Sequence, residues 1–311
     1  MINNISKSYS LWDEPRIYVS GSTSERPLIY CDITKCGSTN WKRTLVEIDK
    51  MMSGEIVESK MGSTDHSWKS RKDQEGFRIR KSPPRRKRSA LDRLEKGGNR
   101  WDSIYVQKLY KTAKQRSDLY TNPNNFKYLF VRDPLERLLS AYRDKVQPVY
   151  NSHPIIGVTK ITGKNQIKKL FNKNLTLSDP RIIDLDTISF QSFLYGIFIK
   201  WPPQKPSQST GAKIRHWHKF YDLCRVCSIK YDFIGKVETI NVDSELVMSE
   251  AGVENRIHMG LHGRSSDNSK MIMYFKGLRK KFILQLYDLY REDFELFGYT
   301  VNSWLWSHLK D

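Results

Sequence analysis

Apolar and polar positions along the chain change period most clearly in residues 28–52. Leu28–Ile33 is an apolar run with the length and residue types of a β-strand, and the polar turn Lys35–Asn40 follows it. After the turn, apolar residues recur at three- and four-residue steps, which predicts a helix that buries Trp41, Leu45, Ile48 and Met52. A strand, a tight turn and a helix form an anion site in many α/β proteins, because free N–H groups and the helix dipole meet at the helix start.

This first turn also carries a cation and hydroxyl groups. Lys35 supplies a positive charge, and Ser38 and Thr39 supply hydroxyl donors. The turn is not a Walker A loop, because the pattern GxxxxGK[ST] is absent and Lys35 precedes Gly37. Taken alone, the pattern fits an anion site and also fits an ordinary capped helix after an edge strand.

A second strand that leads directly into a helix lies further along the chain. Phe126–Val131 predicts the strand, and Asp133 then has the position of an N-cap residue with Pro134 as the first helical residue. Glu136 at the third helical position completes the pattern, so we expect a helix from Pro134 to about Lys145.

Two polar residues of this second unit are candidates for contact with a ligand phosphate. Arg132 closes the strand, so its guanidinium is expected over the helix start. Ser140 lies two turns into the helix, roughly 10 Å from the cap at a rise of about 1.5 Å per residue. A phosphate lying along this groove would contact both side chains. The alternative is an Arg–Glu surface pair and an ordinary helical serine.

The remaining pattern completes an α/β architecture. It predicts a helix over Trp101–Ser117, a helix near Ser189–Ile199 and a strand over Tyr231–Glu238. It also predicts one long amphipathic helix, Met273–Tyr290, with a buried face made of Phe275, Leu278, Phe282, Leu286 and Leu289. Residues 1–27 are interpreted as a polar lead-in and residues 28–311 as one domain with a basic insertion at 69–100. We expect a mainly parallel sheet flanked by helices, with ligand sites at the carboxyl ends of the strands.

The net charge of the chain favours negatively charged partners but does not select one of them. The 311 residues include 53 Lys and Arg against 34 Asp and Glu, which gives a net charge of +19 and a pI near 9.7. Such a surface attracts nucleic acid, anionic membrane or an anionic glycan. The basic block Arg85–Arg88 is interpreted as part of a solvated loop, with polyanion contact or nuclear targeting as alternatives. The sequence contains no apolar run of about 18 residues and no visible signal peptide.

The four cysteines do not form a disulfide scaffold. Cys224 and Cys227 lack a second CxxC or a His pair at zinc spacing, which argues against a structural zinc site. From the residues alone, a local disulfide between these two cysteines and a pair of reduced thiols are both open.

Taken together, KCGSTNWKR and FVRDPLERLLSAYRDK, with Arg132 97 positions after Lys35, resemble the Golgi carbohydrate sulfotransferases. The closest resemblance is to the chondroitin and dermatan 4-O-sulfotransferase branch. Three further blocks support it, namely Tyr30-Cys31, His216-Trp217 with LCRVCSIKYDFIGKVET, and LYDLYREDFELFGY. Thr34 stands where the family usually has Pro, and Ile214 and Arg215 replace the acidic or amide residue that commonly precedes His-Trp.

The resemblance implies a P-loop-NTPase-like sulfotransferase fold and a donor substrate, 3′-phosphoadenosine-5′-phosphosulfate (PAPS). The first motif would hold the 5′-phosphosulfate, through Lys35, Cys36, Gly37, Ser38, Thr39, Asn40 and Trp41. Arg132 and Ser140 would hold the 3′-phosphate. Lys35 would also stabilise the leaving phosphate, and the scheme requires no metal.

The general base and the acceptor site are expected among the histidines, which titrate nearest the working pH. We prefer His66 as the base, with His216 lining the acceptor groove. The resemblance implies transfer to GalNAc O-4 of a chondroitin- or dermatan-like glycan in the Golgi lumen. It further implies a membrane contact only through an N-terminal anchor that this chain lacks. In that compartment Cys224 and Cys227 are expected to be oxidised, and the sequons at Asn4 and Asn174 would carry glycans.

Two other functions are compatible with parts of the sequence. A non-enzymatic, basic protein that binds nucleic acid or another polyanion explains the charge of +19 but not two helix-start anion sites. A nucleotide kinase explains the first turn, but the Walker A pattern is missing. We therefore expect an enzyme with no nucleic-acid partner.

Overall fold

The computed structural model describes residues 15–21, 26–53, 101, 104–145, 190–191, 193–194, 215–254, 256–257, 259 and 268–311. Its centre is a four-stranded sheet in the order β1-β2-β3-β4, with β1 Ile17–Ser20, β2 Leu28–Cys31, β3 Phe126–Val131 and β4 Phe233–Lys236. β1 runs antiparallel to β2, whereas β2, β3 and β4 are parallel. The expected mainly parallel sheet flanked by helices is therefore confirmed.

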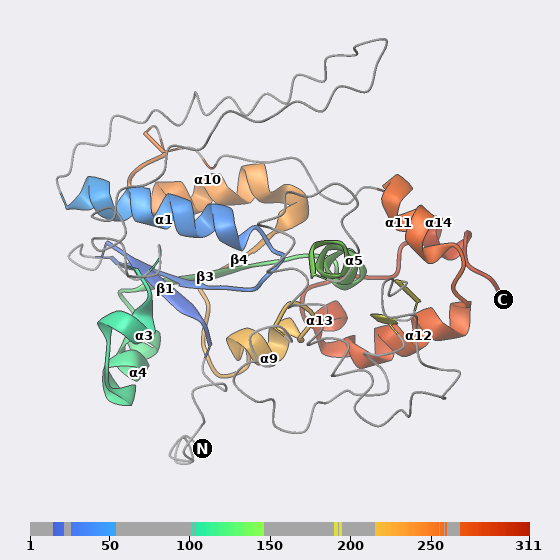
Figure 1. Ribbon diagram of the computed structural model, residues 1–311. Helices are drawn as coiled ribbons and strands as arrows, with labels where there is room; N and C mark the ends of the chain where they lie inside the picture. Colours follow the sequence, from blue (N-terminus) through green and yellow to red (C-terminus); the bar gives the residue numbers. More distant parts are fainter. Residues whose placement is uncertain are drawn as a thin grey trace, which may run out of the picture.

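Helices cover both faces of this sheet (Figure 1). α1 Ser38–Met52 and α10 Ile240–Glu250 lie side by side on one face, where Tyr30, Tyr128 and Phe130 point. α3 Val106–Leu109, α4 Ala113–Thr121 and α9 Phe220–Cys224 lie on the other face, where Ile29, Leu129 and Val131 point. β2 and β3 are buried throughout, since helices pack on both sides of them.

A second core lies beyond the end of the sheet, around α5 Pro134–Lys145 (Figure 1). It includes α11 Asn268–Phe275, α12 Lys280–Leu289, α13 Arg291–Leu296 and α14 Ser303–Trp306. Leu135, Leu138 and Leu139 of α5 are buried against these helices. α5 therefore joins the sheet to the C-terminal helices.

The elements that flank the two turns expected to bind the donor were predicted closely; these donor-type turns are Lys35–Asn40 after β2 and Arg132–Asp133 after β3. The strand Phe126–Val131 and the helix Pro134–Lys145 have the expected bounds. β2 ends at Cys31, shortly before the predicted end, and α1 starts at Ser38 within the predicted turn. β1 lies in the stretch interpreted as a polar lead-in, and the sequence did not predict it.

Two predicted helices are each broken in the structure. Trp101–Ser117 contains α3 and then the start of α4, because Tyr110 is extended and Thr112 starts a new helix with a capping box to Gln115. Met273–Tyr290 contains the end of α11 and then α12, separated by a turn that includes Gly277 and ends at the extended Arg279. In that region Ile283 is fully buried, whereas Phe282 and Leu289 of the predicted buried face are only partly buried.

Two further predictions need correction. The strand predicted over Tyr231–Glu238 is limited to β4, because the chain turns into a 3-10 helix at Val237–Thr239. The predicted Cys224–Cys227 disulfide is wrong, since Cys224 pairs with Cys31 across 193 residues and Cys227 is a free, exposed thiol. This disulfide joins the end of β2 to α9.

Other expectations fall largely outside the described residues. Of the helix near Ser189–Ile199, the structure describes four positions (190, 191, 193 and 194), and all four are helical. The basic insertion at 69–100, Asn4 and Asn174 lie outside the described part of the chain. Among the described helices, none has both the length and the apolar content that a membrane span requires.

Candidate functional site

Three chain segments leave the sheet at the same edge. They follow the carboxyl ends of β2, β3 and β4, which point the same way because these strands are parallel. Each segment leads into a helical start: α1 after β2, α5 after β3, and the 3-10 turn before α10 after β4. The carboxyl edge of a parallel sheet is the usual ligand site of open α/β folds.

The turn between β2 and α1 has a backbone shape that exposes N–H groups. Lys35 and Gly37 both have positive φ angles, of 73° and 76°. Gly37 is the N-cap residue of α1, and as a glycine it has no side chain with which to cap the helix. A Cβ atom on Gly37 would lie 3.2 Å from Ile240 Cδ1, so the turn packs closely against the start of α10. An uncapped helix start of this kind attracts an anion.

The two expected phosphate-binding cations meet at this edge. The guanidinium of Arg132 lies 3.5 Å from the carbonyl oxygen of Lys35 and donates to Glu136 Oε2 at 3.0 and 3.2 Å. Lys35 Nζ lies 3.2 Å from Asp144 Oδ2. The Arg–Glu pair is therefore real but is not a surface pair, because the Arg132 side chain is 5% exposed.

The start of α5 is held by carboxylates. Asp133 is the N-cap residue as predicted, and its Oδ1 accepts the N–H groups of Leu135 and Glu136 at 2.9 and 3.0 Å. Glu238, not Glu136, accepts the N–H of Asp133 at 2.9 Å, and its other oxygen accepts the hydroxyl of Tyr299 at 2.8 Å. Burial raises the pKa of Asp133 to about 7. These contacts tie the β3 and β4 ends together.

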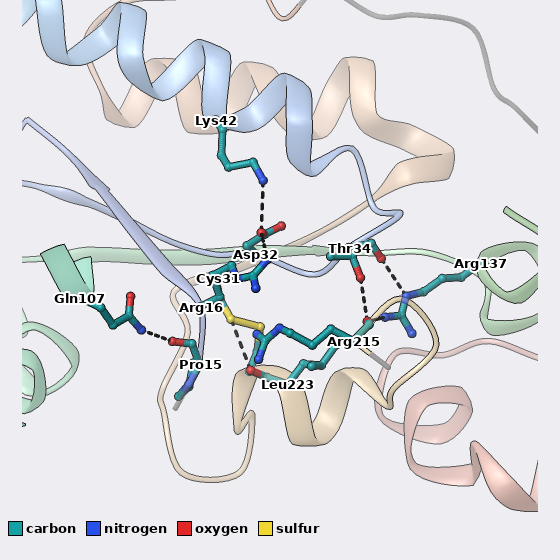
Figure 2. A network of polar contacts seen from close by, with 11 residues as sticks. Pro15, Arg16, Cys31, Asp32, Thr34, Lys42, Gln107, Arg137, Arg215 and Leu223 are labelled. Atoms are coloured by element: carbon teal, nitrogen blue, oxygen red, sulfur yellow. Dashed lines mark hydrogen bonds and ion pairs between the residues drawn. A yellow bond between two sulfur atoms is a disulfide. The ribbon is translucent and has the colours of Figure 1, made fainter. Parts of the chain in front are cut away.

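Arg137 joins the first turn to the segment Arg215–His218 (Figure 2). It is fully buried and donates to the carbonyl oxygens of Thr34, His218 and Arg215 at 2.9, 2.6 and 2.9 Å. Its guanidinium carbon lies 4.6 Å from the ring centroid of Phe220. The Thr34 hydroxyl also donates to the Arg215 carbonyl, at 2.7 Å. Arg137 therefore fixes the His-Trp block beside the donor-type turn.

The histidines expected to act near this turn lie in different parts of the chain. His66 lies outside the described residues. His216 is half-buried in the segment that Arg137 holds. In the same segment, burial and the positive charge of Arg137 lower the pKa of His218 to about 4. A group with that pKa is a weak base at neutral pH, so His218 is poorly suited to take the proton of an acceptor hydroxyl.

The other expected donor-binding residues differ in exposure. Thr39 is exposed, and Ser38 and Asn40 are half-buried, so these three positions at the start of α1 are accessible. Ser140 and Cys36 are buried, and burial raises the pKa of the Cys36 thiol to about 12. Trp41 is fully buried and packs against Tyr30, Tyr128 and Phe130 in the core. The structure therefore leaves Ser38, Thr39 and Asn40 accessible at the start of α1, whereas Cys36, Trp41 and Ser140 are buried.

Sequence reasoning missed Arg137 and Asp32, which both support this edge. Asp32 is completely buried and lies 3.3 Å from Lys42 Nζ. A charged residue inside a predicted strand-to-turn junction was the available signal for Asp32. Arg137 gave none, because it falls on the polar side of a predicted amphipathic helix.

Comparison with known proteins identifies the relatives of this chain. The family model described as "Sulfotransferase family" matches residues 22–300. Carbohydrate sulfotransferase 11 of Mus musculus is 30% identical over 289 residues, covering 90% of this chain and 67% of the relative. Carbohydrate sulfotransferase 10 of Mus musculus is 26% identical (93% and 68% covered), and carbohydrate sulfotransferase 9 of Homo sapiens is 28% identical (92% and 53% covered).

No solved structure matches the chain significantly. The family match covers both donor-type turns and the helices α11 to α13, and nothing in the comparisons supports the non-enzymatic alternative. The chain belongs to the sulfotransferase family, and its relatives are carbohydrate sulfotransferases.

Proposed function

We propose that this protein transfers a sulfuryl group from PAPS to a hydroxyl group of an anionic glycan. The observation that carries the proposal is the meeting of two cation-bearing helix starts, where the Arg132 guanidinium lies 3.5 Å from the Lys35 carbonyl oxygen. A donor with a phosphate at each end of its ribose fits two such sites. The family match makes a PAPS donor the expected substrate.

In this proposal, the 5′-phosphosulfate binds at the uncapped start of α1. The N–H groups of residues 37–39, the Thr39 hydroxyl and Lys35 surround it, whereas the N–H of Asn40 donates to the Gly37 carbonyl oxygen at 3.0 Å. The 3′-phosphate binds Arg132, with Ser140 as a further contact. Lys35 and Arg132 then exchange part of their contact with Asp144 and Glu136 for contact with phosphate.

The reaction is an in-line displacement at sulfur. The acceptor oxygen forms a bond to sulfur while the bond from sulfur to the phosphate oxygen breaks, and its electron pair remains on that phosphate. Lys35 and the helix start stabilise this charge. The proton of the acceptor hydroxyl passes to a general base, for which we propose His66, with His216 lining the acceptor groove. No metal takes part in the scheme.

The acceptor and the compartment are also part of the proposal. A net charge of +19 suits an anionic glycan, and we propose transfer to O-4 of GalNAc in a chondroitin- or dermatan-like chain. The named relatives are several different carbohydrate sulfotransferases, so the acceptor needs a direct test. The buried Cys31–Cys224 disulfide supports an oxidising compartment such as the Golgi lumen.

The experiment is transfer of labelled sulfate from PAPS to a panel of desulfated chondroitin, desulfated dermatan and a neutral glycan. Wild type, Lys35→Ala and Arg132→Ala are compared, with Arg256→Ala as a control because Arg256 is exposed and, among the described residues, bonds only to its own turn. We expect transfer to chondroitin that both site variants abolish and the control retains. Absence of both transfer and donor binding in the wild type would contradict the proposal.

A further inference from the structure

Two cations contact one buried carboxylate beside the donor-type turn, and a third cation, Arg215, interacts with them electrostatically (Figure 2). Asp32 follows β2 and has no exposed surface. Lys42 Nζ lies 3.3 Å and Arg16 Nη1 lies 3.9 Å from the same Asp32 oxygen, Oδ2. The N–H of Asp32 donates to the Arg16 carbonyl oxygen at 2.8 Å, which holds these two residues together.

Arg215 supplies the third cation. Its backbone is fixed, because its carbonyl oxygen accepts from Thr34 and Arg137. Its side chain extends from there toward Arg16 and Asp32 (Figure 2). Burial, and then the like charge of Arg16, lower the pKa of Arg215 to about 10, so it stays protonated at neutral pH.

The guanidinium of Arg215 has one edge without a partner. Nε and Nη2 are buried and donate no hydrogen bond. These two neighbouring N–H groups form the fork that binds both oxygens of a carboxylate. Buried charged donors without an acceptor destabilise a fold, so an anion that accepted from this edge would be bound favourably.

The charges of the cluster do not cancel. Among the described residues, Asp32 is the only carboxylate within 4 Å of Arg16 or Lys42, and no ion pair is formed by Arg215. The other contacts of Lys42 are the rings of Tyr18 and Trp101, with centroids at 5.3 and 5.7 Å. These rings hold the ammonium without adding a negative charge. Three positive charges therefore face one negative charge.

We infer that Arg215, Arg16 and Lys42 form an anion subsite that binds the acidic group of the acceptor sugar. The cluster lies next to Thr34 and thus next to Lys35, on the β1 side of the turn, whereas Arg132 lies on the β3 side. An acceptor that reaches the transfer point from the β1 side brings its carboxylate to the fork of Arg215. The Arg16 side chain is 31% exposed, so the cluster is accessible to solvent on the side of Arg16. The inference rests on the proposed glycan acceptor.

The test compares a charged and a neutral acceptor. Chondroitin and carboxyl-reduced chondroitin are used with wild type, Arg215→Gln, Arg215→Lys and the control Arg256→Gln. A charged hydrogen-bonded pair corresponds to about a 10- to 100-fold change in binding. We expect Arg215→Gln to raise KM for chondroitin by that factor, with an unchanged KM for the carboxyl-reduced form and an unchanged Kd for 3′-phosphoadenosine-5′-phosphate. Arg215→Lys, which keeps the charge but not the fork, should lie in between.

Equilibrium binding separates this inference from the proposed function. If wild type transfers sulfate to neither acceptor, the proposed acceptor is wrong, and titration with a chondroitin hexasaccharide then tests the subsite alone. Tighter binding by wild type than by Arg215→Gln would still support it. The inference would be overturned if Arg215→Gln changed KM equally for both acceptors. It would also be overturned if wild type and Arg215→Gln bound the hexasaccharide equally while the variant had a lower melting temperature. Arg215 would then be a structural partner for the free Oδ1 of Asp32. Should Arg215→Gln not fold, Arg16→Gln gives the same comparison.

Discussion

Arg137 is the residue whose removal should damage the site most without touching a ligand. In Arg137→Met the side chain keeps its length and loses the guanidinium. The carbonyl oxygens of Thr34 and His218 then lose the Arg137 donor in the interior, whereas the carbonyl oxygen of Arg215 keeps the Thr34 hydroxyl. Each buried acceptor without a partner costs about 1–3 kcal/mol, and since such losses overlap we expect a destabilisation of about 3–5 kcal/mol.

The assay is urea denaturation followed by tryptophan fluorescence, because Trp41 and Trp217 lie in separate cores. Arg256→Met is the matched control and should stay within about 0.5 kcal/mol of wild type. Arg137→Lys keeps the charge but not the fork, so it should recover part of the loss. In the folded variant, KM for the glycan should rise more than the Kd for the donor product, because the segment 215–218 loses its anchor. Wild-type stability and KM in Arg137→Met would refute this reasoning.

Three further perturbations have defined outcomes. Gly37→Ala should weaken donor binding and lower the melting temperature more than Gly252→Ala, because both glycines have positive φ but only Gly37 is closely packed against a neighbour; equal effects would contradict the close packing. Cys224→Ser should cost about 2–5 kcal/mol of unfolding free energy and Cys227→Ser almost nothing, measured by urea denaturation without reductant; the reverse order would refute the pairing. Because the pKa of folded His218 is about 4 against 6.5 when unfolded, the unfolded state binds more protons between these pH values. The contribution of His218 to stability should therefore fall by about 1.6 kcal/mol from pH 6.5 to pH 5, which the difference between wild type and His218→Gln measures in pH-dependent denaturation.

Strong local signals explain which parts of the fold were predictable. Asp133, Pro134 and the apolar run before them define β3 and α5, and both elements have the predicted bounds. β1 was missed because it has only four residues and depends on pairing with β2. The break between α11 and α12 was missed because Phe275 and Leu278 keep helical spacing across it, although Gly277 lies between them.

The site was predictable where a backbone motif defines it. The turn around Gly37 and the start of α5 appear in the sequence as strand-to-helix junctions, and parallel pairing brings them together. Arg137 was not predictable, because at about 100° per residue it lies roughly opposite Leu135 on the helix and is expected in solvent. The carbonyl groups that accept its hydrogen bonds belong to the turn around Thr34 and to the segment that starts at Arg215. Only the tertiary structure brings these two segments to Arg137. The Cys31–Cys224 pair, 193 residues apart, also depends on the fold alone.

The most direct test of the account is a comparison of two nucleotides by isothermal titration. 3′-Phosphoadenosine-5′-phosphate and adenosine 5′-monophosphate differ only in the 3′-phosphate proposed to bind Arg132. We expect wild type to bind the first about 10- to 100-fold more tightly, a preference that Arg132→Ala removes. Lys35→Ala should weaken both nucleotides by the same factor and keep the preference. A wild type without preference for the 3′-phosphate, or an Arg132→Ala variant that retains it, would contradict a donor site built from these two helix starts.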